Sequence, residues 1–238
     1  MYQVLNTRKS VPSPNQLGHF FQAASSSFCL YDRRHYSDTT IATTSRMEST
    51  TPRYNGPHPN EMNHKQKEIH DYILKSRPST GLSGPFGPWL AVPEIAEPAS
   101  QLGKACRYDT SLSLRESELV ILLTGAKMRC STEFNIHKGE ALKAGISMDI
   151  ISAIPRDDDF SLETVQRKLI PLLENSREKA ILNFTAELLE TSTVSDKTYF
   201  DTKTALDNKD SVLVEITSIT GYYTYVAYTL NVFRIPFK

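Results

Sequence analysis

The chain has 238 residues, of which 39% are hydrophobic and 23% charged, a composition typical of globular domains. Its 27 basic and 27 acidic residues cancel, so the net charge gives no attraction to nucleic acid or to an anionic membrane. No run of apolar residues approaches the roughly 18 that a membrane-spanning helix requires. We therefore expect neither nucleic acid nor a membrane as a partner.

Residues 1–46 differ in composition from the rest of the chain, with five basic residues, two acidic residues and twelve serines or threonines. A helical stripe of apolar side chains is formed by Leu17, Phe20, Phe21, Ala24 and Phe28. These features are typical of a mitochondrial presequence, and Arg34–Ser37 resembles a matrix-processing site. The sequence thus predicts a disordered leader and a location in the mitochondrial matrix. The alternatives are a disordered tail on a cytoplasmic protein, or an extension upstream of a true start at Met47 instead of Met1.

Helical patterns begin after a predicted linker at residues 47–60, which is rich in proline and lacks apolar periodicity. The first predicted helix, residues 60–76, is followed by a loop at 81–89 with too much glycine and proline for a helix or strand. Pro93 suits the first position of the second helix. Its apolar stripe is predicted to contain Ile95, Ala99, Leu102 and Cys106.

Ser113 and Glu116 form a capping box that predicts a third helix from residue 114 to about 126. A fourth helix is expected from about Cys130 to Ala144, ending at Gly145. Further helices are predicted at residues 147–154, 161–173, 176–190, 195–206 and 211–233. Because alternating strand patterns are absent, the predicted class is all-α, with one helical domain at residues 61–238.

Four residues with reactive side chains are predicted to meet between the third and fourth helices. Cys130, Glu133 and His137 are three and four positions apart, a spacing that places them on one helix face. A tight reversal at residues 125–129 would bring Glu118 beside them. Two carboxylates and an imidazole supply a general acid and a general base. The start of a helix would favour the thiolate form of Cys130.

Each of these residues also has a purely structural interpretation. His137 could be a hydrogen-bonded core residue, and with Glu133 it could form a surface pair worth only about 0.3–0.5 kcal/mol. Cys130 could be a small buried hydrophobe, as we expect for Cys106. A metal site is not predicted, since the chain has no CxxC or HxxxH spacing.

Three motifs in order resemble the carboxymuconolactone decarboxylase / alkylhydroperoxidase D superfamily. The first is Gly84-Pro-Phe-Gly-Pro-Trp-Leu, and the last comprises Val214-Glu-Ile, Gly221-Tyr-Tyr and Leu230-Asn. Between them lie the run from Arg115, the pattern Cys-x-x-Glu-Phe-x-x-His, and Glu140-Ala-Leu-x-Ala-Gly-Ile-Ser. The resemblance covers residues 61–238. It implies an alkylhydroperoxidase D-like helical bundle and a homo-oligomer, either a trimer or a hexamer.

The two branches of the superfamily imply different reactions. The alkylhydroperoxidase D branch has a CxxC pair that cycles between dithiol and disulfide, but here Glu133 takes the place of the second cysteine. The decarboxylase branch keeps a Glu and a His four residues apart, as this chain does at Glu133 and His137. That branch uses no metal or organic cofactor, so the resemblance implies none here.

The leading hypothesis is therefore a cofactor-free carboxy-lyase or isomerase acting on a small carboxylated lactone or unsaturated acid. In this hypothesis His137 transfers the proton, assisted by Glu133 and Glu118. The candidates for contact with the substrate are Arg107, Arg115 and Trp89. The alternatives are a one-cysteine peroxidase or thiol oxidoreductase that uses Cys130, and a non-catalytic homo-oligomeric module.

Overall fold

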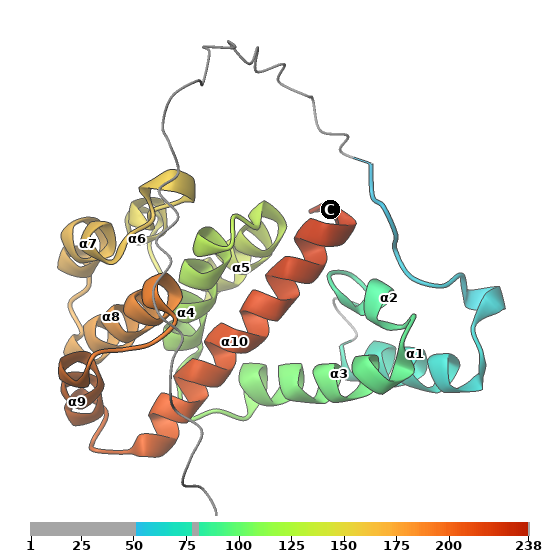
Figure 1. Cartoon of the computed structure of the whole chain (residues 1–238), viewed down its shortest axis with the longest axis horizontal. Coiled ribbons are helices and arrows are strands. Elements are labelled where there is room, and N and C mark those ends of the chain that lie inside the picture. Colours follow the sequence, from blue (N-terminus) through green and yellow to red (C-terminus); the bar gives the residue numbers. More distant parts are fainter. Residues whose placement is uncertain (1–50, 78–80, 238) are drawn as a thin grey trace, which may run out of the picture. The chain divides into compact units, whose positions relative to one another are not determined.

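The computed structural model describes residues 51–77 and 81–237, and Figure 1 shows its helices. These residues contain no β-strand, which confirms the predicted all-α class. None of their helices is both long and apolar enough to cross a membrane. The predicted leader at residues 1–46, its processing motif and Met47 lie outside the described residues, so the leader and the matrix location stay predictions.

The α-helices are α1 (His64–Ser76), α2 (Phe86–Trp89), α3 (Pro93–Tyr108), α4 (Leu114–Lys127), α5 (Ser131–Lys143), α6 (Met148–Ala153), α7 (Leu162–Thr164), α8 (Ser176–Thr191), α9 (Asp196–Ala205) and α10 (Asp210–Phe233). Short 3₁₀ turns lie at Pro59–Glu61, Asp157–Asp159 and Ile170–Leu172, and a π-helical turn lies at Val165–Leu169. The predicted capping box at Ser113 and Glu116 is present at the start of α4.

Helix α4 is the central element of the fold. Every residue from 116 to 126 is buried, as expected for a helix that is apolar on all sides. Val120 and Ile121 belong to a core cluster shared with α1, α3 and α10. Leu119, Leu122 and Leu123 face a second cluster shared with α6 and α8. Helix α4 thus separates two cores, and any charged side chain in its middle must be paired to be tolerated there.

Helix α10 packs against both α4 and α3, which brings the C-terminal part of the chain to the helices that carry the predicted site (Figure 1). The C-terminal end of α10 is joined to residues in the predicted linker. The backbone N–H of Arg53 donates to the Phe233 carbonyl at 2.9 Å, and its guanidinium donates to the Val232 carbonyl at 2.9 Å. Part of the segment predicted as a linker is therefore attached to the helical body.

The buried face of α3 differs from the predicted stripe. Cys106 is buried and Ala99 packs against the core as predicted, but Ile95 and Leu102 are each 48% exposed. The other buried positions include Ala96, Ser100 and Gly103. The prediction was wrong for Ile95 and Leu102 because small residues carry little hydrophobic signal, yet they allow close helix packing. A Cβ atom on Gly103 would lie only 2.1 Å from the hydroxyl oxygen of Tyr222 on α10.

Two other segments also differ from expectation. The predicted loop at residues 81–89 contains the short helix α2, whose residues are buried. Gly87 permits this, because a Cβ there would lie 2.1 Å from the carbonyl oxygen of Asn55. The predicted helix at 161–173 is divided into α7, the π turn and a 3₁₀ turn. Pro171 lacks the N–H group that a continuing α-helix would use.

Candidate active site

A three-residue reversal connects α4 to α5 and sets the geometry of the site. Arg129 adopts a left-handed conformation with φ of 51°, and the Cys130 N–H donates to the Gly125 carbonyl at 3.0 Å. The helices then run antiparallel, because Gly125 lies close to Phe134 and the side chain of Glu118 reaches His137. The predicted meeting of residues on α4 and α5 is thus present in the structure.

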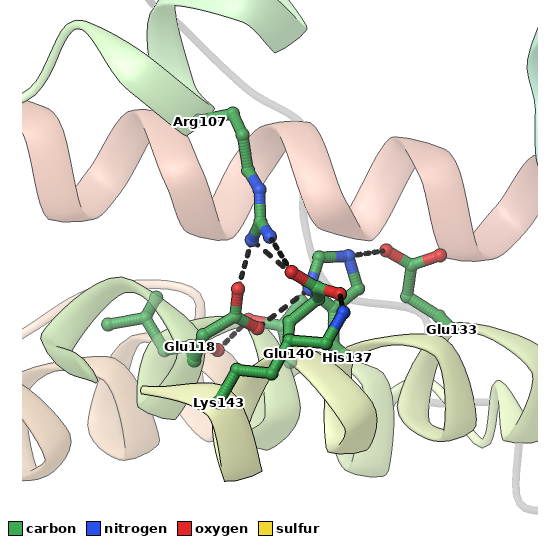
Figure 2. A network of polar contacts seen from close by, with 8 residues as sticks. Arg107, Glu118, Glu133, His137, Glu140 and Lys143 are labelled. Atoms are coloured by element: carbon green, nitrogen blue, oxygen red, sulfur yellow. Dashed lines mark hydrogen bonds and ion pairs between the residues drawn. The ribbon is translucent and has the colours of Figure 1, made fainter. Parts of the chain in front are cut away.

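His137 lies between two buried carboxylates (Figure 2). Its Nδ1 is 2.8 Å from a carboxylate oxygen of Glu118, and its Nε2 is 3.1 Å from one of Glu133. The exposed fractions of Glu118, Glu133 and His137 are 0%, 3% and 7%. The interpretation of Glu133 and His137 as a surface pair is excluded by this burial. We call the three residues the relay.

The two carboxylates fix the charge of the imidazole. Burial by itself lowers the pKa of His137, but the charges and hydrogen bonds of Glu133 and Glu118 outweigh burial and raise it to about 9. At neutral pH His137 is therefore an imidazolium that donates a hydrogen bond from each ring nitrogen. The imidazolium of His137 can donate a proton as a general acid, and the neighbouring carboxylate of Glu133 can accept one as a general base.

Arg107, on α3, reaches the relay from the side opposite to α4 and α5, the helices that carry Glu118, Glu133 and His137 (Figure 2). Its guanidinium forms an ion pair with Glu118 and lies 3.4 Å from a carboxylate oxygen of Glu140. Burial lowers the pKa of Arg107, but the charge of Glu118 more than offsets burial and raises it. Arg107 is thus a permanent cation beside the imidazole. It also lines the cavity beside His137, and its predicted contact with a substrate stays a prediction.

Two adjacent tyrosines of α10, which the sequence analysis did not select, complete the site. The ring of Tyr223 meets that of His137 edge-on, with 5.1 Å between centroids and an angle of 86°. Burial raises the pKa of Tyr223 and of Tyr222, so both hydroxyls stay protonated at neutral pH. Tyr223 belongs to an apolar stripe in the sequence, and only its contact with His137 distinguishes it from a core residue.

The relay opens onto a cavity of about 200 Å³. The lining includes Glu133 and His137 but not Glu118, which lies behind them. Its other lining residues are Arg77, Ser83, Gly84, Pro85, Phe86, Gly103, Arg107, Tyr108, Ile136, Glu140, Tyr222, Tyr223 and Val226. A small molecule here would meet two guanidinium groups, three tyrosine rings, an imidazolium and two carboxylates. We name this space the relay cavity.

Cys130 does not have the environment that the sequence suggested. It precedes α5 as the N-cap residue, is 1% exposed, and is absent from the lining of the relay cavity. Burial raises the pKa of the thiol to about 11, and this outweighs hydrogen bonds from the Glu133 and Thr132 backbone that favour the thiolate. The expectation that the helix start makes Cys130 a thiolate is therefore corrected.

Arg115 and Trp89 also lie away from the relay cavity. The guanidinium of Arg115 is 2.7 Å from a carboxylate oxygen of Glu178 and donates to the Gly145 carbonyl at 2.6 Å. These partners hold it in the wall of a second cavity, which is lined by Arg115, Gly145, Ser147, Asp149, Ile150, Leu172, Glu174, Asn175 and Glu178. The indole N–H of Trp89 donates to the Thr229 hydroxyl at 3.0 Å, inside the core. Neither side chain is therefore positioned to contact a molecule beside His137, and both predictions of substrate contact are corrected.

The described residues contain no group of three or more His, Cys, Asp or Glu side chains arranged to hold a metal ion. The Glu–His–Glu contacts of the relay use both ring nitrogens of His137 for hydrogen bonds to carboxylates. The chemistry that this donor set supports directly is proton transfer.

Comparison with solved structures identifies the fold. One similar structure is an alkylhydroperoxidase AhpD core, an uncharacterized peroxidase-related protein from Ralstonia eutropha JMP134. It has a TM-score of 0.61 and 16% sequence identity, and the match covers 79% of this chain and 92% of that one.

The debrominase Bmp8 is also similar, both as a cysteine-to-alanine variant in complex with 2,3,4-tribromopyrrole and in the apo form. The TM-scores are 0.59 and 0.58, each at 8% identity over 80% of this chain and 94% of the other. No family model matches the sequence, and no curated protein matches it. At these identities the comparisons establish the alkylhydroperoxidase D-like fold, which confirms the predicted bundle.

Proposed function

We propose that this chain, which has the alkylhydroperoxidase D-like fold, is a cofactor-free lyase or isomerase that moves a proton on a small unsaturated acid or carboxylated lactone. The observation that carries the proposal is the buried relay of Glu118, His137 and Glu133, which opens onto a cavity beside Arg107. The three relay residues have separate roles in this proposal. Glu118 orients the imidazole, His137 supplies the proton, and Glu133 shares that proton at the cavity wall.

For a decarboxylation, the bond between the substrate carboxylate and its carbon breaks, and carbon dioxide leaves. The electron pair stays on the substrate and is delocalised as a dienolate. The protonated hydroxyl of Tyr223 supplies a hydrogen-bond donor for the dienolate oxygen. The proton shared by His137 and Glu133 is added to the carbon, and one proton from water then restores the relay. For an isomerisation, Glu133 removes a proton from one carbon and the relay returns it to another.

Hydrogen exchange with solvent tests this proposal. The full-length protein would be incubated in D₂O with carboxylated lactones and related unsaturated acids, and carbon dioxide and deuterium at carbon would be measured. We expect His137→Ala to slow deuterium incorporation at least ~100-fold, because the proton donor is lost. A matched variant is Asn135→Ala, since Asn135 is an exposed residue on α5. Full activity in His137→Ala would contradict the mechanism.

A thiol-based oxidoreductase is the second candidate, and the position of Cys130 favours it. The thiol lies next to the start of α5, where the backbone N–H groups of Thr132 and Glu133 favour its thiolate form. The similar structures include proteins named as peroxidase-related and as a debrominase. In a peroxidase reaction the sulfur attacks the peroxide oxygen, the O–O bond breaks to release water or an alcohol, and an external dithiol reduces the resulting sulfenic acid.

The burial of Cys130 weighs against this candidate, because a protonated, covered thiol reacts slowly with peroxide. Peroxide consumption with a dithiol reductant would be compared between the wild type and Cys130→Ser. Equal rates would dismiss the candidate. If the rate of peroxide consumption depends on Cys130 but not on His137, the thiol oxidoreductase would replace the lyase as the proposed function.

We also propose that the protein is a homo-oligomer. Helix α10 exposes large apolar side chains, with exposed fractions of 64% for Val214, 58% for Tyr228 and 53% for Val232, and the last two lie one turn apart. Exposed apolar side chains that lie close together are typical of protein interfaces. Sedimentation of the wild type and of Tyr228→Asp tests this, and a monomeric wild type at micromolar concentration would refute it.

A further inference from the structure

The charged groups of the relay and its immediate partners neutralise one another. Arg107 pairs with Glu118 and Glu140, and Lys143 also pairs with Glu140 at 2.7 Å. The imidazolium of His137 is held by Glu118 and Glu133. Three cations therefore match three carboxylates. Arg107, named from the sequence as a candidate for the substrate carboxylate, is already occupied in this arrangement.

Arg77 is a further cation in the wall of the same cavity, and it has no such partner. Across residues 51–77 and 81–237, no carboxylate lies within ion-pair distance of its guanidinium. The relay cavity and its surrounding pairs thus carry one net positive charge. An anionic group from a bound molecule would neutralise it.

The guanidinium of Arg77 is held in place by neutral contacts. It donates to the side-chain hydroxyl of Ser100 at 3.1 Å and to the Ser100 carbonyl at 3.0 Å. It also lies over the ring of Phe86, 4.6 Å from the centroid. Ser100 is completely buried in α3. A long side chain fixed by these contacts loses little entropy on binding an anion, so the geometry is preorganised.

Tyr222 provides a second hydrogen-bond donor near this guanidinium. The charge of Arg77 acts on the phenol of Tyr222, and both residues line the cavity. The Tyr222 hydroxyl reaches its position because Gly103 has no side chain, as a Cβ there would lie 2.1 Å from it. A planar guanidinium beside a hydroxyl donor is suited to the two oxygens of a carboxylate.

We propose that Arg77 is a specificity-determining residue that binds an anionic group of the substrate, with Tyr222 as a second donor, while the relay acts on another part of the same molecule. The part of this inference that places a reaction at the relay rests on the proposed function. The part that assigns anion binding to Arg77 does not. It predicts that the cavity selects carboxylic acids over their uncharged esters. It also assigns the role first given to Arg107 and Arg115 to a different arginine.

Binding measurements with a small cyclic acid test the inference without requiring turnover. The probes are 2-furoate and methyl 2-furoate, titrated into the full-length protein by calorimetry. We expect the wild type to bind the acid at least ~10-fold more tightly than the ester, since a hydrogen-bonded charge is lost in the ester. Arg77→Gln should remove that difference by weakening only the acid. Arg77→Lys, which keeps the charge but not the planar fork, should retain part of it.

Arg167→Gln is the matched control, because Arg167 is exposed and outside the cavity lining. This variant should bind both probes as the wild type does. Thermal unfolding of each variant would establish that Arg77→Gln is folded, and Ser100→Ala offers a milder way to release the guanidinium if it is not. The inference is overturned if the wild type binds acid and ester equally, or if the preference survives in Arg77→Gln.

Turnover separates this inference from the proposed function. With a substrate in hand, Arg77→Gln should raise KM more than it lowers kcat, whereas His137→Ala should lower kcat. Selective binding of the acid without any deuterium incorporation would remove the lyase proposal and leave the role of Arg77 intact. Normal turnover and a normal KM in Arg77→Gln would remove the role of Arg77 and leave the lyase proposal intact.

Discussion

The relay cavity and the second cavity, around Arg115, are built on the same buried Glu–Arg pairing but differ in what surrounds it. Behind the relay cavity Glu118 pairs with Arg107, and in the second cavity Glu178 pairs with Arg115. Both pairs include a residue of α4, since Glu118 lies one turn after Arg115. A buried ion pair by itself therefore does not identify a functional site in this protein.

The surroundings distinguish the two. The second cavity is the larger, at about 510 Å³, but its lining contains no histidine and no aromatic ring, and it adds two exposed acids, Asp149 and Glu174. The relay cavity has an imidazolium between two carboxylates, three tyrosines and a guanidinium without an acidic partner among the described residues. Opposed titratable groups in a small space, and not the size of the space, mark the candidate active site.

The largest expected difference between the cavities comes from removing the charge of each glutamate. Glu118→Gln should destabilise the fold by about 3–5 kcal/mol, because Arg107 and His137 lose a fully buried partner. It should also lower turnover by about 100-fold, since His137 is no longer held as an imidazolium. Urea unfolding and the deuterium assay measure the two effects.

Glu178→Gln is the matched change in the second cavity. Because the side chain of Arg115 is 29% exposed, water can replace part of the lost interaction, and we expect a cost of about 1–3 kcal/mol with unchanged turnover. Equal losses of turnover in the two variants would show that the comparison does not separate a structural pair from a catalytic one.

The pH dependence of stability should come from the relay and not from the second cavity. The pKa of His137 is about 9 in the folded chain and about 6.5 when unfolded, so the folded state binds the proton more tightly. The resulting stabilisation is complete below pH ~6.5 and is lost as the pH rises towards 9. Its total is about 3 kcal/mol. Unfolding in urea at pH 6 and pH 9 measures it.

His137→Gln is the reference for that experiment, since it removes the titrating group and leaves a side chain that can still donate. The loss of stability between pH 6 and pH 9 should shrink by about 3 kcal/mol in this variant. An identical pH profile for the two proteins would mean that the imidazole is not held as a cation by Glu118 and Glu133.

The smallest expected effect concerns a single methyl group at the wall of the relay cavity. Gly103→Ala forces Tyr222 to move, which should cost about 1–3 kcal/mol and weaken the binding of 2-furoate. Gly139→Ala is the matched change on α5, where a Cβ meets nothing within 4 Å. It should stabilise the protein by up to about 1 kcal/mol and leave binding unchanged. Thermal unfolding and calorimetry distinguish these outcomes, and tight furoate binding in Gly103→Ala would argue against a role for Tyr222.

Local signals in the sequence were sufficient for most of the secondary structure. The capping box at Ser113, the proline that opens α3 and the spacing of Glu133 and His137 act within one or two helical turns, so they can be identified without the rest of the fold. The resemblance of three motifs added the fold, which the solved structures confirm. The buried face of α3 was missed, because helical periodicity cannot distinguish a small-residue face that packs closely from an apolar face left exposed.

Most of the helices, the all-α class and the presence of a carboxylate and an imidazole on one face of α5 could be predicted from the amino-acid sequence alone. Which charges meet depends instead on how the helices pack. The tertiary structure paired Arg107 with Glu118, placed Arg115 in another cavity and buried the thiol of Cys130. It also brought Arg77 into the site from the C-terminal end of α1, and Tyr223 from α10. The physical reason is that pairing and burial depend on distances between helices far apart in the chain, whereas spacing along one helix is set by the 3.6-residue turn alone.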